Sequence, residues 1–256
     1  MARKIVVTSG KGGVGKSTVA VGLGIALSKL GERVILCDAD FGLNNIDVMT
    51  GVENNVAYDV VDVIENRCRA KQALVKHPDF CNLHILSSSH SVPERYVSPQ
   101  ALKLVLDALS PQFDFILIDS PSGIDEGFHR AVAAADEALV VVTPHLTALR
   151  DADKVVTMLK SYEPRALSLV INRMRGDTLL SGECLSPEEI AELLKTEILG
   201  VLPESYELNK SEFTGNHYPF RLLASNLVSG KRKIYDTTRK YGGVFGRLRR
   251  FILRNL

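Results

Sequence analysis

The sequence lacks long hydrophobic runs and paired cysteines. No stretch of 18 uncharged apolar residues occurs, so we expect no transmembrane helix. The N-terminal residues run straight into a strand-like segment, and we therefore expect no signal peptide. The four cysteines, at positions 37, 68, 81 and 184, form no CxxC pair, which favours a reducing, cytosolic compartment. An apolar fraction of 45% and a charged fraction of 24% exclude disorder as the state of the whole chain.

Charge is unevenly distributed along the chain, although the formal net charge is only +1. Residues 231–256 hold nine Lys or Arg and one acid, Asp236, for a net charge of +8. Residues 1–230 hold 22 bases and 29 acids, for a net charge of −7. An acidic body with a basic tail indicates an anionic partner for the tail, either a membrane or a nucleic acid.

Short Val- and Ile-rich runs alternate with longer helical patterns. Several of these runs are apolar on successive residues, as in Ile116–Ile118 and Val140–Val142, so both faces of the strands must be covered. The order predicts an α/β fold, a single doubly wound and mostly parallel sheet. The expected strands are 4–8, 33–38, 83–86, 115–119, 138–143, 167–172 and 198–202. The expected helices are 16–30, 99–110, 126–135, 147–161 and 187–197.

A phosphate-binding loop is the strongest motif in the chain. It matches GxxxxGK[ST], follows a strand and precedes a helix, which is the context that the motif requires. Its glycines let backbone N–H groups surround a phosphate at the positive end of the following helix. We expect Lys16 to reach the β- and γ-phosphates and the Ser17 hydroxyl to bind Mg²⁺. The expected nucleotide-binding residues of the loop are Gly10, Lys11, Gly12, Gly13, Val14, Gly15, Lys16, Ser17 and Thr18.

An ordinary phosphate loop does not explain the second lysine, Lys11. The string KGGVGKST at residues 11–18 resembles the deviant Walker A signature of the MinD/ParA class of P-loop ATPases. This resemblance implies that Lys11 reaches across a dimer interface to the nucleotide of the other subunit. It therefore also implies a homodimer in the ATP-bound state.

Carboxylates close two of the expected strands. Asp38 and Asp40 follow the strand at 33–38, and Asp119 ends the strand at 115–119, so all three should lie where the phosphate loop lies. DADFGLNNID at 38–47 and DSPSGI at 119–124 resemble the two switch regions of the MinD family. The resemblance implies that Asp40 orients the attacking water, and that Asp38 and Asp119, with Ser17, serve the metal and its water shell.

Recognition of the base and the γ-phosphate depends on four further residues. Gly123 would let a backbone N–H approach the γ-phosphate. Asn172 and Arg173 resemble the adenine-contacting position of the family, and Pro203 begins what looks like the loop over the base. No NKxD string follows Asn172, which argues against guanine and favours ATP with Mg²⁺ as the ligands.

The C-terminal segment forms a basic amphipathic pattern. At 100° per residue one face is apolar and the opposite face carries arginines, a combination that suits an anionic membrane surface. We therefore divide the chain into an ATPase domain, 1–240, and a membrane-targeting helix, 241–256. The apolar face comprises Val244, Phe245, Leu248, Phe251, Ile252 and Leu256, and the basic face Arg247, Arg250 and Arg254.

The resemblance to the MinD family spans nearly the whole chain and implies a role in placing the division site. Such a protein hydrolyses ATP, is cytoplasmic and peripheral on the inner face of the cell membrane, recruits a MinC-like septum inhibitor, and is released by a topological factor such as MinE. The partners are expected to dock near residues 147–153. A flagellar-number regulator of the same class and a DNA-partitioning ParA-like ATPase remain alternatives. We expect no nucleic-acid partner, because the basic charge lies on an amphipathic terminus.

Overall fold

An eight-stranded sheet forms the centre of the protein, in the order β3-β4-β2-β5-β1-β6-β7-β8. The computed structural model describes residues 1–41, 45–88, 97–204 and 217–241. All neighbouring strands are parallel except β3, which runs antiparallel to β4 at one edge. The strands are β1 Arg3–Thr8, β2 Val34–Asp38, β3 Leu74–Lys76, β4 Leu83–Leu86, β5 Phe115–Asp119, β6 Glu137–Val142, β7 Leu167–Met174 and β8 Glu197–Pro203.

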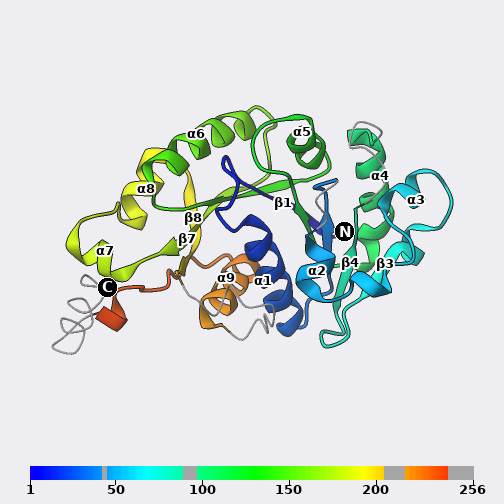
Figure 1. Ribbon diagram of the computed structural model, residues 1–256, viewed down its shortest axis with the longest axis horizontal. Coiled ribbons are helices and arrows are strands. Elements are labelled where there is room, and N and C mark those ends of the chain that lie inside the picture. Colours follow the sequence, from blue (N-terminus) through cyan, green and yellow to red (C-terminus); the bar gives the residue numbers. More distant parts are fainter. Residues whose placement is uncertain (42–44, 89–96, 205–216, 242–256) are drawn as a thin grey trace.

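Helices cover both faces of this sheet, as the continuous apolar strands predict (Figure 1). The step from β1 to β2 runs one way across the sheet, whereas the steps from β4 through β5, β6 and β7 to β8 run the other way. Because such crossovers are right-handed, α1 covers one face and α4, α5, α6 and α8 cover the other. The helices are α1 Lys16–Lys29, α2 Ile46–Thr50, α3 Val60–Ile64, α4 Pro99–Leu109, α5 Glu126–Ala133, α6 Leu146–Lys160, α7 Gly176–Ser181, α8 Pro187–Leu194 and α9 Tyr218–Ser229. Short 3₁₀ turns occur at η1 Glu53–Asn55, η2 Ala70–Ala73, η4 Ser110–Gln112 and η6 Arg239–Tyr241.

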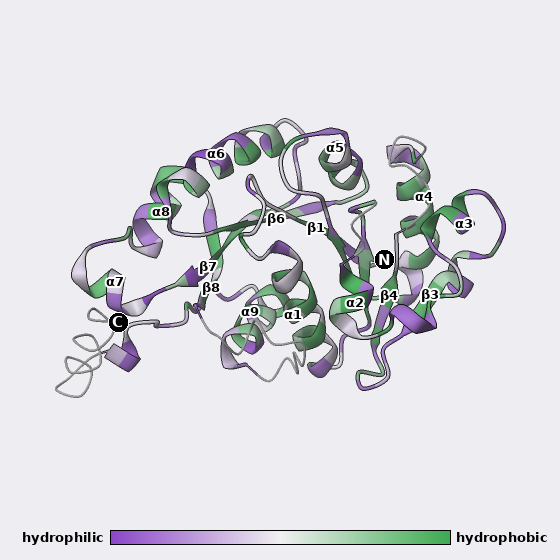
Figure 2. Cartoon of the chain, in the orientation of Figure 1, coloured by the Kyte–Doolittle hydropathy of each residue, from purple (hydrophilic) through white to green (hydrophobic). Residues whose placement is uncertain are grey.

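The predicted doubly wound sheet is confirmed, and each expected strand lies within two residues of an observed one. Every residue of β2 and β5 is buried. Figure 2 shows the strands as mostly hydrophobic, and hydrophilic residues gathering on the outer turns of the helices. Among the described residues, no helix is long and apolar enough to cross a membrane.

The expected helix at 187–197 was too long. Its start is as predicted, because Ser186 caps the backbone N–H of Glu189 and the Glu189 carboxylate accepts from the Ser186 N–H. Its end comes at Leu194, where Lys195 adopts a left-handed conformation with φ 48°. The chain then enters β8 at Glu197.

Helix α9 was not predicted, yet it completes the face that α1 covers. Phe220 is fully buried and lies against Gly22 of α1, where an added Cβ would come within 2.4 Å of its ring. Glycine at position 22 therefore lets the two helices pack closely. Strand β3, the short helices α2 and α3, and α7 were also absent from the predicted elements.

Candidate functional site

The phosphate loop lies between β1 and α1, at the carboxyl ends of the central strands. Gly13 and Gly15 have φ angles of 79° and 91°, which glycine adopts without strain. Helix α1 then begins at Lys16, so its unpaired N–H groups face the loop. A cavity of about 530 Å³ opens here. Its lining comprises Ser9, Lys11, Gly12, Gly13, Gly15, Lys16, Ser17, Thr18, Asp40, Asn45, Val48, Met49, Ser122 and Arg173.

Two glycines of the loop are required by close contacts with other elements. A Cβ on Gly10 would lie 2.3 Å from the carbonyl carbon and oxygen of Asp151 in α6. A Cβ on Gly15 would lie 2.4 Å from the Asn172 amide nitrogen, which donates a hydrogen bond of 2.8 Å to the Val14 carbonyl. The conformation of the loop is therefore fixed by α6 on one side and by β7 on the other.

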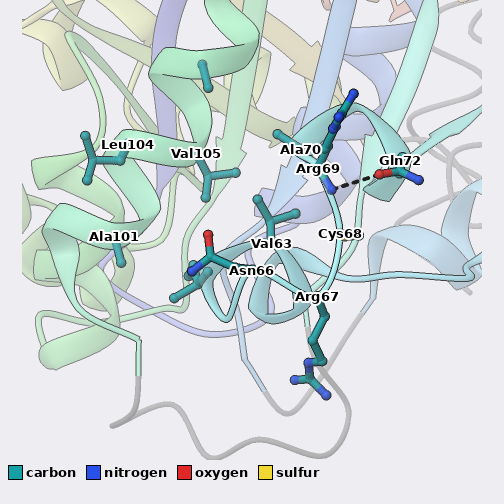
Figure 3. Close-up of a pocket in the computed structure, with 12 residues that line it drawn as sticks. Val63, Asn66, Arg67, Cys68, Arg69, Ala70, Gln72, Ala101, Leu104 and Val105 are labelled. Carbon is teal, nitrogen blue, oxygen red and sulfur yellow. Dashed lines mark hydrogen bonds between the residues drawn. The ribbon is translucent and has the colours of Figure 1, made fainter.

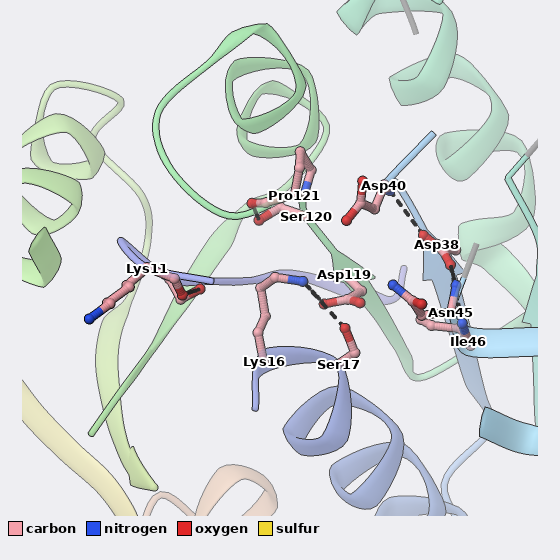
Figure 4. A network of polar contacts seen from close by, with 11 residues as sticks. Lys11, Lys16, Ser17, Asp38, Asp40, Asn45, Ile46, Asp119, Ser120 and Pro121 are labelled. Atoms are coloured by element: carbon pink, nitrogen blue, oxygen red, sulfur yellow. Dashed lines mark hydrogen bonds and ion pairs between the residues drawn. The ribbon is translucent and has the colours of Figure 1, made fainter. Parts of the chain in front are cut away.

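Lys16 is buried and ion-paired. Its ammonium lies 2.7 Å from Oδ1 of Asp119 and 3.5 Å from the Ser17 hydroxyl (Figure 4). The Asp119 residue is 1% exposed and Lys16 is 8% exposed, so this pair is shielded from water. The three residues that the sequence assigned to the phosphates and the metal thus lie together.

Asp38 ends β2, where it is the register partner of Asp119 in β5. Burial, and then the charge of Asp119, raise the pKa of the Asp38 carboxyl to about 6. Three backbone N–H groups donate to it, from Asp40 at 2.9 Å, Asn45 at 2.9 Å and Ile46 at 3.2 Å. Asp38 therefore holds the segment that carries Asp40 and begins α2.

Asp40 and Lys11 lie at the rim of the cavity. Asp40 is half-buried and its carbonyl accepts from the Ser88 hydroxyl at 3.4 Å. Lys11 is exposed, its ammonium 3.3 Å from the Thr147 hydroxyl of α6. Figure 4 shows the Lys11 side chain pointing away from Lys16 and the carboxylates.

The four residues predicted for the γ-phosphate and the base lie at different places around the loop. The Gly123 N–H donates to the Ser9 carbonyl at 3.0 Å, with Gly123 at φ 92°. Asn172 is 5% exposed and contacts the loop as described above, whereas Arg173 lines the cavity at φ 56°. Pro203 pairs with Met174 where β7 and β8 end and is not among the lining residues. The base-binding roles stay predictions.

Sequence reasoning missed the contribution of α2. Asn45, Val48 and Met49 line the cavity, and Val48 is 61% exposed. Asn45 lies within the string at 38–47, and Val48 and Met49 directly follow it, but no role was predicted for these residues. The amphipathic segment 242–256, with its predicted apolar and basic faces, lies outside the described residues, as do residues 42–44.

A phosphate loop at the reversal point of a doubly wound parallel sheet defines a P-loop nucleotide-binding fold. A family model described as an AAA domain matches residues 2–169. The chain is 43% identical over 231 residues to the septum site-determining protein MinD of Thermotoga maritima, covering 90% of this chain and 84% of that protein. The chain belongs to the MinD family of P-loop ATPases.

Solved structures agree with this assignment. A structure of the MinC:MinD cell division protein complex from Aquifex aeolicus is 36% identical with a TM-score of 0.79, covering 91% of this chain and 100% of that chain. MinD of Pyrococcus horikoshii OT3, complexed with Mg-ADP, is 28% identical with a TM-score of 0.79, covering 91% of this chain and 99% of that chain. The family relationship thus extends over most of the described fold.

Proposed function

We propose that this protein is an ATP-hydrolysing switch that dimerises with ATP bound, binds an anionic membrane and recruits a MinC-like septum inhibitor to place the division site. The observation that carries the proposal is the arrangement of two lysines around one cavity. Lys16 lies inside it, buried against Asp119, whereas Lys11 lies at its rim and is exposed. One lysine thus serves the nucleotide of its own subunit and the other is free to meet a second subunit.

Hydrolysis needs positioning more than covalent chemistry, because phosphoryl transfer is largely dissociative. The loop N–H groups and Lys16 bind the β- and γ-phosphates of ATP. Lys16 then exchanges its contact with Asp119 for the phosphates. Asp40, at the cavity rim, orients the water for attack in line with the leaving group.

The donor set suits Mg²⁺, since the Ser17 hydroxyl and the Asp38 and Asp119 carboxylates are all oxygen ligands. Among the described residues, no group of three or more His, Cys, Asp or Glu is arranged to hold a metal by itself. That agrees with a cation held largely by water and the substrate phosphates. Bound there, Mg²⁺ would neutralise phosphate charge during transfer. Ser17 would bind the cation directly, and Asp119 and Asp38 would orient its water shell.

The membrane step follows from the tail and the dimer together. Each Lys or Arg near an anionic leaflet adds ~1 kcal/mol of attraction, and a single short helix binds reversibly. A dimer presents two tails, and the second increases affinity by ~10²–10⁴ at high effective concentration. Nucleotide state would therefore control membrane residence. A topological factor such as MinE would end it by stimulating hydrolysis.

Partner recruitment is supported by family membership. The related Aquifex aeolicus protein is seen with MinC. On this chain, a MinC-like partner would dock near residues 147–153, at the start of α6. Leu146 is 74% exposed there, and Thr147 contacts Lys11. A docked partner would thus touch the residue that also senses the second subunit.

Sedimentation with phosphatidylglycerol vesicles, in ATP and in ADP, tests this function. We expect the full chain to bind in ATP at least tenfold better than in ADP, and a chain ending at Gly243 to lose that binding. Phosphatidylcholine vesicles, whose zwitterionic headgroups carry no net charge, are the control for apolar adsorption. Equal binding in the two nucleotides, or unchanged binding after truncation, would contradict the proposal. Binding to double-stranded DNA in ATP would instead favour the DNA-partitioning alternative.

A further inference from the structure

A second hollow lies away from the phosphate loop, between the segment α3–η2 and helix α4. It has a volume of about 680 Å³ and adjoins another of about 750 Å³ through residues they share, Arg69, Ala70, Gln72 and Ala108. Figure 3 shows Ala101, Leu104 and Val105 on one side of it and Val63, Arg67 and Arg69 on the other. We call this continuous hollow the α3–α4 groove.

The apolar wall of the groove comes from α4. One face of this helix is buried against the core through Leu102, Val105, Leu106 and Leu109. Ala101, Leu104 and Ala108 form a second apolar stripe with the spacing i, i+3 and i+7, and all three line the groove. Leu104 is 70% exposed, so this stripe has no covering element among the described residues. Val63 and Ile64 of α3 continue the apolar lining on the opposite wall.

The charged rim of the groove is uneven. Arg67 forms ion pairs with Asp62, at 3.1 Å, and with Glu65. Arg69 and Lys71, at the η2 end, are exposed and form no ion pair within the described residues. The Arg69 backbone N–H donates a hydrogen bond of 3.0 Å to the Gln72 side-chain oxygen. This bond fixes the turn that presents the two cations. One end of the groove thus carries two cations that have no ion-pair partner in the part of the chain that the structure describes.

We propose that the α3–α4 groove binds an amphipathic helix of a partner protein, with apolar residues along one face and acidic residues at the end that meets Arg69 and Lys71. Helices bind such grooves through side chains spaced i, i+3, i+4 and i+7, which match the two apolar walls. Acidic residues fit because opposite charge stabilises the encounter and fixes the orientation of the helix.

Charge also argues against two other occupants. The chain's own C-terminal segment is basic, with four arginines among residues 247–254, and would meet cations of the same sign. A second copy placed with its cationic end against this one would bring Arg69 and Lys71 of both subunits together. This docking surface is separate from the cavity and from α6, because α3, η2 and α4 lie toward the β3 edge of the sheet (Figure 1).

A pair of designed peptides tests the proposal on the full chain in ADP. Both are fluorescein-labelled 18-residue helices with leucines at i, i+3, i+4 and i+7. One has glutamates at one end, and the other has lysines at the same positions. In fluorescence anisotropy we expect the glutamate peptide to bind at least tenfold more tightly than the lysine peptide. Leu104→Glu and, separately, Arg69→Glu should each weaken its binding at least tenfold.

Matched variants separate the groove from a general effect of charge. Leu193→Glu replaces a leucine that is 54% exposed on α8, and Arg165→Glu replaces an exposed arginine after α6. Neither should change peptide binding, and all four variants should keep the ATPase rate and the melting temperature of the parent. Because the peptide assay contains no membrane, failure of the vesicle experiment would leave this proposal intact.

Four results would overturn it. Equal binding of the two peptides would remove the charge argument, and equal loss in the control variants would remove the location. Tighter peptide binding after truncation at Gly243 would identify the chain's own tail as the occupant. Loss of phosphatidylglycerol vesicle binding in Leu104→Glu, without loss of peptide binding, would identify the groove as a membrane contact.

Discussion

The two ends of the phosphate loop differ in how fully the chain itself surrounds them. At the Lys16 end, a buried ammonium is held by Asp119, with Asp38 beside it and three backbone N–H groups on the Asp38 carboxylate. At the Gly10 end the backbone presses against α6, but the Lys11 side chain is exposed and makes one 3.3 Å contact. A single chain thus completes the first end and leaves the second open. The contrast predicts that a substitution at Lys16 changes the stability of the fold, whereas one at Lys11 changes dimerisation.

Replacing Lys16 should give the largest loss in the free energy of unfolding. Lys16→Met leaves Asp119 buried without its partner, next to a second carboxyl, and breaking such a pair costs about 3–5 kcal/mol. Urea unfolding of the nucleotide-free protein at pH 7.5 measures this. The matched control is Lys154→Met, which removes an exposed lysine 3.5 Å from Asp151 and should cost about 0–1 kcal/mol. Equal losses in the two variants would mean that the buried end is not held by this pair.

The Asp38 carboxyl should give the next largest effect, visible as a pH dependence of the free energy of unfolding. Its pKa is raised from 3.8 to about 6, so between those values the folded protein binds more protons than the unfolded chain. The protonated Asp38 carboxyl therefore contributes on the order of 2–3 kcal/mol to the free energy of unfolding. This contribution is fully present below pH 3.8 and is lost as the pH rises through 6.

Asp38→Asn should remove that pH dependence. Urea unfolding from pH 4.5 to 7.5, without Mg²⁺ or nucleotide, should show the parent losing stability relative to the variant as the pH rises. Burial lowers the pKa of His77 and His84, which works in the opposite direction, but both proteins contain these residues and the difference cancels them. A constant difference across the range would contradict the prediction.

Lys11 should have the smallest effect on folding. Lys11→Ala removes an exposed side chain and should change the free energy of unfolding by less than about 0.5 kcal/mol. If the open end awaits a second subunit, the same variant should stay monomeric in ATP while the parent dimerises. Analytical ultracentrifugation measures the mass, and Lys154→Met again serves as the exposed-lysine control. A variant that still dimerised would leave Lys11 without its proposed role.

Much of the site was predictable because its determinants are local. The loop needs glycine where φ is positive, a lysine and a hydroxyl at the start of a helix, and a strand before it, and all of these are adjacent in the sequence. Asp119 was found because a buried run ends in a carboxylate. What the sequence alone did not reveal is that Lys16 and Asp119 form an ion pair, since that contact joins residues 103 positions apart.

The missed elements had different causes. The buried residues Phe220, Leu223, Ala224 and Leu227 of α9 have the spacing of an amphipathic helix, so that signal was present and went unused. Helices α2 and α3 have five residues each, too few to show a period. The α3–α4 groove depends on how two segments about 35 residues apart pack together, and no local pattern encodes it.

The close contact between Gly10 and Asp151 limits how far α6 can move toward the phosphate loop. Atoms at their packing distance resist compression steeply but hardly resist separation. A displacement of α6 toward the loop would therefore be transmitted to it at once, while an equal displacement away would not pull it along. Through this contact, apart from the Lys11–Thr147 hydrogen bond, the phosphate loop is coupled to α6 in one direction only.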